Sequence, residues 1–264
     1  MDKSEYISNF DSLILNPVTR KLYGEEEFFN VGYWLEDTQN QQSACHNLIE
    51  KLLEFLPEKQ GNILDVGCGL GATTNYLLKY YSSNDVVGIN MSSQQIERCT
   101  INSPECKFIC MDAVEMEFND DLFDNIICVE AAFYFETRKK FIQEAWRVLK
   151  PGGHLILSDI IFDNTQLFGD WIVPQTNIVK EKDIKTYKNL YQQAGFQLLE
   201  FVDVTDECWL THYRYLKSSI ETEWQAGEID EQTYQVNISA IDNLLSSSSI
   251  TYLLVAIKKP VKQF

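Results

Sequence analysis

The sequence predicts a doubly wound α/β fold, in which short apolar strands alternate with helices around a mostly parallel sheet. Strands that are buried on both faces of such a sheet have nearly continuous apolar sequences rather than an alternation of apolar and polar residues. Seven runs of this kind predict the strands: residues 63–66, 85–90, 108–110, 124–130, the segment after Gly153, 196–205 and 250–259. At 264 residues with 45% hydrophobic content, the chain is expected to form one domain with insertions rather than two independent domains.

The first strand ends in a glycine-rich loop, in the segment ILDVGCGLGATT of residues 63–74. Its three glycines, beginning with Gly67 and Gly69, lie where glycine lets the backbone turn sharply and approach a ligand. Asp65 stands at the strand tip, where a carboxylate would repel a pyrophosphate but attract a cationic amino group. Gly67, Gly69 and Ala72 also fit the dinucleotide fingerprint G-x-G-x-x-A, so a nucleotide site and a turn without a ligand are alternatives at this point.

The later strands end in polar residues and in turn signals. The second strand ends in Asn90, whose amide can accept one hydrogen bond from a ribose hydroxyl and donate another. Ser92 or Ser93 is expected to cap the helix that follows. Asp112 follows the third strand, and Pro151 opens a Pro-Gly-Gly turn before the fifth. As alternatives, Asn90 is an ordinary turn residue and Asp112 caps the next turn.

Together these motifs resemble the class I S-adenosylmethionine-dependent methyltransferases over residues 61–162. The resemblance implies a Rossmann-like, seven-stranded sheet with an antiparallel last strand, and S-adenosyl-L-methionine as the cofactor. In this family the glycine loop passes beneath the methionine and ribose, and residues such as Asn90 and Asp112 contact the ribose and the adenine amino group. The cofactor-binding residues that the resemblance implies are Tyr33, Asp65, Gly67, Gly69, Asn90, Met91, Gln95, Asp112, Ala113 and Glu130.

Residues 1–60 are expected to form an N-terminal helical flap, with helices over about 4–22 and 39–56. The aromatic loop EEEFFNVGYW lies between these helices. It resembles a flap of small-molecule methyltransferases, in which Tyr33 would close over the methionine end of the cofactor. The alternative is that the aromatic residues of this loop, Tyr33 included, pack the helices onto the sheet.

Residues 61–264 are expected to form the methyltransferase domain, with a helical lid insertion at about 206–249. The separation of the last two strands is too long for a hairpin turn, so an inserted helical pair is predicted there. With the flap as the first cover, the second is expected from the C-terminal third: residues 161–175, a helix over about 181–194 that ends at Gly195, and this inserted pair. Such covers would form the acceptor pocket.

Methyl transfer is an in-line displacement that needs a base only when the acceptor must lose a proton. Related O-methyltransferases carry a histidine where this chain has Tyr134, in the segment EAAFYF that begins at Glu130. A phenol with a pKa of about 10 is a poor base at neutral pH. The candidate catalytic residues are therefore Tyr134, positioning the acceptor, and His212 of the inserted helices, acting as the base unless its role is structural.

Composition narrows the possible partners and the compartment. A net charge of −17 with 22 Lys and Arg provides no basic surface for nucleic acid or for an anionic membrane. Seven cysteines without C-x-x-C pairs, and an N-terminus without the apolar core of a signal peptide, predict a reducing cytoplasm. The three dispersed histidines show no zinc pattern, so no metal is expected.

We therefore expect S-adenosylmethionine-dependent methyl transfer to a small-molecule acceptor, most simply to a hydroxyl of a specialised metabolite. N-methylation of an amine-containing metabolite is the alternative. A nicotinamide-dependent oxidoreductase and a noncatalytic S-adenosylmethionine-binding protein are more distant alternatives.

Overall fold

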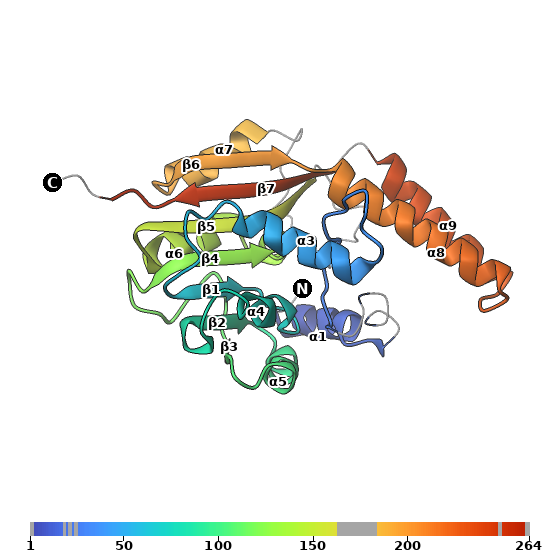
Figure 1. Cartoon of the computed structure of the whole chain (residues 1–264), viewed down its shortest axis with the longest axis horizontal. Coiled ribbons are helices and arrows are strands. Elements are labelled where there is room, and N and C mark those ends of the chain that lie inside the picture. The colour runs from blue at the N-terminus through green and yellow to red at the C-terminus, as the bar shows by residue number, and fades with distance from the viewer. Residues whose placement is uncertain are drawn as a thin grey trace.

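The computed structural model describes residues 3–17, 20, 23, 26–162, 184–247 and 250–261. Its centre is a seven-stranded sheet of order β3-β2-β1-β4-β5-β7-β6 (Figure 1). The strands are β1 (Ile63–Val66), β2 (Val86–Asn90), β3 (Lys107–Cys110), β4 (Phe123–Val129), β5 (Leu149–Phe162), β6 (Gln197–Asp203) and β7 (Ile250–Lys258). Six strands run in one direction, and β7 is antiparallel to both of its neighbours. The predicted doubly wound sheet with an antiparallel last strand is therefore confirmed.

Helices cover both faces of this sheet, because successive side chains of each strand point to opposite faces. On one face lie α3 (Gln41–Leu53) and α4 (Ala72–Leu77), whose apolar side chains pack in one cluster with Ile156 and Leu254. On the other face lie α6 (Arg138–Val148) and α7 (Ile184–Gln193), whose cluster includes Leu155 and Val255. Alternate residues of β5 and β7 thus enter different cores.

The fifth strand begins earlier than the sequence predicts. Leu149 already pairs with Phe123, and the ladder resumes where His154 pairs with Asn125, so the Pro-Gly-Gly segment forms an irregularity within β5. Gly152 has φ +90, a left-handed conformation that L side chains rarely adopt. The turn signal therefore marks a bulge inside a strand rather than the start of one.

The remaining helices lie beside the sheet or beyond its carboxyl end. The N-terminal helix α1 (Lys3–Ile14) ends earlier than the predicted 4–22, and α5 (Ser93–Asn102) begins at the Ser92 cap, which accepts a hydrogen bond from the Gln95 amide. A π-helical turn (Asp206–Leu210) leads into α8 (Thr211–Gln225) and α9 (Glu231–Ser246), which pack on each other and project from the body (Figure 1).

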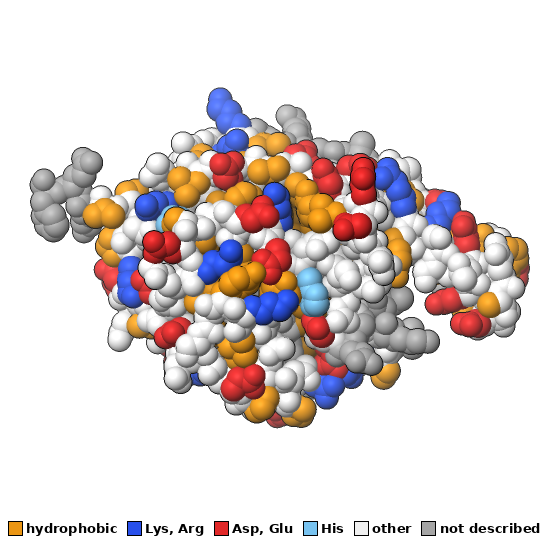
Figure 2. Space-filling model, viewed as in Figure 1, with side chains coloured by type: hydrophobic (Ala, Val, Ile, Leu, Met, Phe, Trp, Pro, Cys, Tyr) orange, Lys and Arg blue, Asp and Glu red, His pale blue; other side chains and the backbone are white. Residues whose placement is uncertain are grey.

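Most of the predicted cover at 161–175 lies outside the described residues, as do the first three residues of the helix predicted at 181–194. On the face shown in Figure 2, basic side chains are interspersed with acidic ones. Within the described parts of the chain, no helix is long and apolar enough to cross a membrane.

Candidate active site

The glycine loop lies at the carboxyl end of β1, and its backbone conformation is one that favours glycine. Gly67, Gly69 and Gly71 all have positive φ, between 55° and 89°. The backbone amides of Gly67 and Cys68 donate to the carbonyl of Ile89 at 2.9 and 3.0 Å, which ties the loop to β2. A side chain at Gly67 would collide with Ala131, so only glycine fits where the loop passes the end of β4.

This loop forms one wall of a cleft of about 950 Å³, counted to its open mouth. Ten of the twelve predicted site residues line it: Asp65, Gly67, Gly69, Asn90, Met91, Gln95, Asp112, Ala113, Glu130 and Tyr134. The opposite wall includes Tyr6, Phe10 and Ile14 of α1 together with Phe28 and Phe29, which the sequence analysis did not assign to the site.

Asp65 is buried at the tip of β1, with 1% of its surface exposed. Its Oδ2 accepts a hydrogen bond from Thr74 Oγ1 at 2.6 Å. Burial raises the pKa of the carboxyl to about 7, because a charged group loses its hydration, and the bond from Thr74 only partly opposes this. A cation above the loop would favour the ionised form.

Asn90 belongs to a hydrogen-bonded group that reaches the N-terminal helix. Its Nδ2 donates to Gln95 Oε1 at 2.8 Å, and its Oδ1 accepts from the Ser92 amide at 3.0 Å. Gln95 and Ser92 in turn donate to the two carboxylate oxygens of Asp11, at 2.7 and 2.9 Å. Asp11 thus fixes α1 above the end of β2, although an acid within a helical pattern gives no sequence signal for this role.

Asp112 lies in the loop after β3 and is held from two sides. Its Oδ1 accepts from the Val114 amide at 3.1 Å, and its Oδ2 pairs with Lys3 Nζ at 2.5 Å. The pair with Lys3 is a second link between α1 and the floor of the cleft. Because Lys3 is mostly exposed, this ion pair contributes little to stability.

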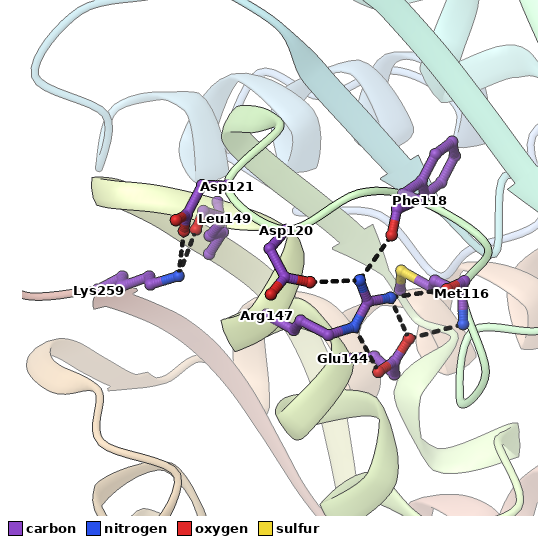
Figure 3. Close-up of polar contacts among 8 residues, drawn as sticks. All are labelled: Met116, Phe118, Asp120, Asp121, Glu144, Arg147, Leu149 and Lys259. Atoms are coloured by element: carbon purple, nitrogen blue, oxygen red, sulfur yellow. Dashed lines mark hydrogen bonds and ion pairs between the residues drawn. The ribbon is translucent and has the colours of Figure 1, made fainter.

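The rest of that loop is anchored to α6 (Figure 3). Arg147 donates to the carbonyls of Met116 and Phe118, both at 2.6 Å, and Glu144 accepts from the Met116 amide at 2.7 Å. Lys259, at the end of β7, donates to Asp121 and to the Leu149 carbonyl, both at 2.6 Å. These contacts hold the loop that carries Asp112 and Ala113 against the sheet.

Glu130 follows β4 and has φ +48, a left-handed conformation that is uncommon for a residue with a side chain. Its Oε1 accepts two hydrogen bonds, from the Val31 amide at 2.8 Å and from the Tyr252 hydroxyl at 2.6 Å. Burial raises the pKa of this carboxyl to about 7, and both bonds act in the opposite direction. Glu130 therefore joins the N-terminal segment, β4 and β7 at the cleft.

Tyr134 lines the cleft and packs against Phe133 and Phe10, with ring centroids 4.1 and 5.0 Å away. Burial raises the pKa of its hydroxyl well above the ordinary value, with smaller contributions from Tyr6 and Glu130. An even smaller fraction of this hydroxyl is therefore ionised at neutral pH than its residue type predicts, so it cannot take up a proton there, which agrees with a positioning role.

The structure does not bring Tyr33 or His212 to the cleft. The Tyr33 amide donates to the Ala44 carbonyl at 2.8 Å, and the residue packs on α3 rather than over the glycine loop. His212 is 2% exposed, and its Nδ1 lies 2.8 Å from Gln41 Oε1. Burial lowers the pKa of His212 to about 3, so the imidazole is neutral and a poor proton acceptor at physiological pH. His212 therefore does not lie where a catalytic base would have to be, at the cleft, because α8 directs its side chain toward α3.

The described residues contain no group of three or more His, Cys, Asp or Glu side chains arranged to hold a metal ion. The polar and aromatic groups that line the cleft include carboxylates, amides and aromatic rings.

Comparison with known proteins agrees with this geometry. Residues 64–157 match a family model described as a methyltransferase domain. Relatives include O-methyltransferase cnsE of Penicillium expansum, 28% identical over 68% of both chains, and erythromycin 3''-O-methyltransferase of Saccharopolyspora erythraea, 29% identical over 72% of this chain and 69% of the relative. A 27-O-demethylrifamycin SV methyltransferase of Amycolatopsis mediterranei is 25% identical over 91% of this chain and 92% of the relative.

Solved structures with the same fold include the [4+2]-cyclase SpnF, with a TM-score of 0.74, 20% identity and coverage of 99% of this chain and 98% of that one. A geranyl diphosphate methyltransferase in complex with GPP and sinefungin has a TM-score of 0.74, 15% identity and coverage of 96% and 99%. At these identities the structures establish the fold alone.

The fold and the glycine-loop cleft define a class I methyltransferase domain. Residues 64–157 thus form a methyltransferase domain, and the chain is an S-adenosylmethionine-dependent methyltransferase with S-adenosylmethionine as its cofactor. The dinucleotide interpretation of Gly67, Gly69 and Ala72 is thereby excluded.

Proposed function

We propose that this enzyme transfers the methyl group of S-adenosylmethionine to a hydroxyl of a small specialised metabolite. The observation that carries the proposal is a cleft with two chemically different walls. One wall holds the glycine loop and the polar strand ends, and the other is aromatic and formed by α1 and by Phe28 and Phe29. The relatives named above, which match most of the chain, are O-methyltransferases.

The residues of the polar wall fit the cofactor in the order that the strands give them. Asp65, beneath the glycine loop, would favour the cationic ammonium group. Asn90 would contact a ribose hydroxyl through its side-chain oxygen. This Oδ1 accepts only one hydrogen bond from the described residues, so it can accept a second from a ligand. Asp112 Oδ2, now paired with Lys3, would accept a hydrogen bond from the adenine amino group. Met91, Gln95 and Ala113 would line the adenosine part.

The surrounding segments would enclose the acceptor. In this proposal residues 1–60 are the flap, residues 61–264 the methyltransferase domain, and residues 206–249 the lid. The aromatic side chains of the flap would exclude water and hold an apolar acceptor in line with the sulfonium. Tyr134 would position the acceptor from the end of β4.

Binding and turnover test this proposal separately. S-adenosylhomocysteine should bind in calorimetry, whereas NADH should not. Incubation with S-adenosylmethionine and 27-O-demethylrifamycin SV, alongside other hydroxyl acceptors and phosphoethanolamine as the amine control, should yield S-adenosylhomocysteine together with an O-methylated product. Methylation of the amine alone would replace the hydroxyl proposal by N-methylation. A chain that binds the cofactor but forms no S-adenosylhomocysteine would contradict the proposal.

A further inference from the structure

We propose that Glu130 is the residue that accepts the proton from the acceptor hydroxyl during methyl transfer. The inference rests on the proposed O-methylation and adds the base that neither Tyr134 nor His212 supplies. Tyr134 carries a phenol whose pKa is raised, and His212 lies outside the cleft against Gln41. Glu130 remains as a carboxylate at the junction of the two walls.

The two oxygens of Glu130 have different surroundings. Oε1 is occupied by the donors of Val31 and Tyr252, at 2.8 and 2.6 Å. Oε2 receives no hydrogen bond from any of the described residues, although the side chain lines the cleft. One oxygen is thus used to orient the carboxylate, and the other keeps its lone pairs for a ligand.

The backbone also fixes this carboxylate in place. The left-handed conformation of Glu130 is strained, and such strain persists where surrounding contacts enforce it. Here the Glu130 amide donates to the hydroxyl and to the carbonyl of Ser158 on β5, at 3.1 and 3.2 Å. Because the contacts of Oε1 and of the amide come from three segments, the carboxylate is held before any ligand binds.

The groups around Glu130 leave its charge uncompensated. Among the described residues, the titratable groups that face it are phenols and thiols: Tyr23, Tyr134, Tyr213, Tyr252, Cys45 and Cys208. Burial raises the pKa of each, so all are neutral at physiological pH. A cationic sulfonium in the cleft would be the missing counter-charge and would favour ionised Glu130.

This arrangement couples the charge of the base to the state of the cofactor. With S-adenosylmethionine bound, Glu130 is ionised and Oε2 accepts the hydrogen of the acceptor hydroxyl. As the acceptor oxygen bonds to the methyl carbon, the carbon–sulfur bond breaks and its electron pair stays on sulfur, while the proton passes to Oε2. The product S-adenosylhomocysteine is neutral at sulfur, and the carboxyl stays protonated until water reaches it on release.

A first experiment needs no acceptor, because it compares the two forms of the cofactor. The dissociation constants of S-adenosylmethionine and S-adenosylhomocysteine are measured by calorimetry from about pH 5.5 to pH 9. The preference for S-adenosylmethionine should rise about tenfold across neutral pH, because the ionised carboxylate attracts the sulfonium whereas the protonated carboxyl does not. In Glu130→Gln the preference should not change with pH. A flat preference in the wild type would overturn the proposal.

The control for this experiment is Glu136→Gln, which removes an exposed carboxylate paired with Lys140. It should leave the pH dependence intact. Tyr252→Phe removes a donor to Oε1, so it should move the transition to higher pH without abolishing it. Because a glutamine carbonyl can still accept from Val31 and Tyr252, Glu130→Gln should fold, and circular dichroism checks this.

A second experiment separates a base from a simple electrostatic role. Single-turnover methylation of 4-methoxyphenol, a neutral hydroxyl, and of 4-nitrophenol, which is largely ionised at about pH 8, is compared in both forms. Glu130→Gln should slow the first reaction by about 10²–10⁴-fold and the second only a few-fold. Equal loss with both phenols would overturn the assignment as a base. If the wild type methylates no hydroxyl, here or in the acceptor screen, the proposed function fails, whatever the cofactor preference.

Discussion

Gln95 on α5 donates a hydrogen bond to Asp11 on α1 at 2.7 Å, although the two residues are 84 positions apart in the chain. Because Ser92 donates to the other oxygen of the same carboxylate, Asp11 is the main polar attachment of the N-terminal helix to the end of β2. The aromatic wall of the cleft depends on this attachment.

Asp11→Ala should therefore weaken cofactor binding without touching the glycine loop. The change leaves two buried donors unpaired and releases α1, so we expect the affinity for S-adenosylhomocysteine to fall by about 1–3 kcal/mol. Calorimetry measures this loss. Glu5→Ala, an exposed change in the first turn of the same helix, serves as the control and should bind normally. Equal binding by both variants would contradict a role for α1.

Asp65→Ala removes the carboxylate beneath the glycine loop. The affinity for S-adenosylmethionine should fall by about 1.5–3 kcal/mol, the scale of a hydrogen bond to a charged group. Thr74→Val is the matched variant, since it deletes the hydrogen bond to Asp65 but keeps the acid. It should raise the pKa of Asp65 further and weaken binding mainly below neutral pH. Unchanged affinity in folded Asp65→Ala would remove Asp65 from the cofactor site.

His212→Leu should lower stability and leave turnover nearly unchanged. The folded-state pKa of about 3 is below the ordinary value of about 6.5. The contribution of neutral His212 is therefore present above about pH 6.5 and is lost as the pH falls toward 3. Urea unfolding at several pH values should show a shallower acid loss in the variant. A large loss of turnover with intact cofactor binding would instead restore His212 as the base.

Tyr134→Phe keeps the ring that packs on Phe10 and Phe133 but removes the hydroxyl. A positioning role predicts a change of only a few-fold in kcat, because no proton acceptor is lost. Steady-state rates from about pH 6 to pH 9 provide the test. A rate loss of about 10²-fold or more would mean that the hydroxyl takes part in proton transfer.

Arg147→Met should loosen the loop after β3 (Figure 3). The guanidinium holds the carbonyls of Met116 and Phe118, so its loss should lower the free energy of unfolding by about 1–3 kcal/mol. Cofactor affinity should fall less, because Asp112 keeps its bond to the Val114 amide. Hydrogen exchange at residues 112–122 would report the loosening, and Lys140→Met on the same helix is the control. Unchanged exchange in Arg147→Met would contradict the anchoring role.

The sheet could be predicted from sequence because its signals are local. Val66 is followed directly by the glycine loop, and Asn90 ends an apolar run. The end of each strand and the polar residue of the site are therefore predicted by the same short segment. The irregularity at Gly152 was not predicted, since a Pro-Gly-Gly turn signal carries no information on where the pairing with Phe123 begins.

The other wall of the cleft could not be predicted in the same way. Asp11 and Tyr252 reach the site through contacts with Ser92, Gln95 and Glu130 that join distant parts of the chain. A histidine on a helix predicts a buried face but not the neighbour it meets, and for His212 that neighbour is Gln41. Residue type therefore suggested a base that the packing of α8 directs elsewhere.

The helices α8 and α9 connect the end of β6 to the start of β7, and these two strand ends lie side by side. Asp203, at the end of β6, pairs with Leu253 on β7, and the Val204 amide donates to the Tyr252 carbonyl at 3.0 Å. The two strands are thus paired close to the residues where the inserted helices begin and end. The length and sequence of the projecting helices can therefore change without shifting the register of any strand. Exchanging this helical pair between related enzymes is thus expected to leave the cofactor half of the molecule as it is, since none of the described residues of the pair lines the cleft.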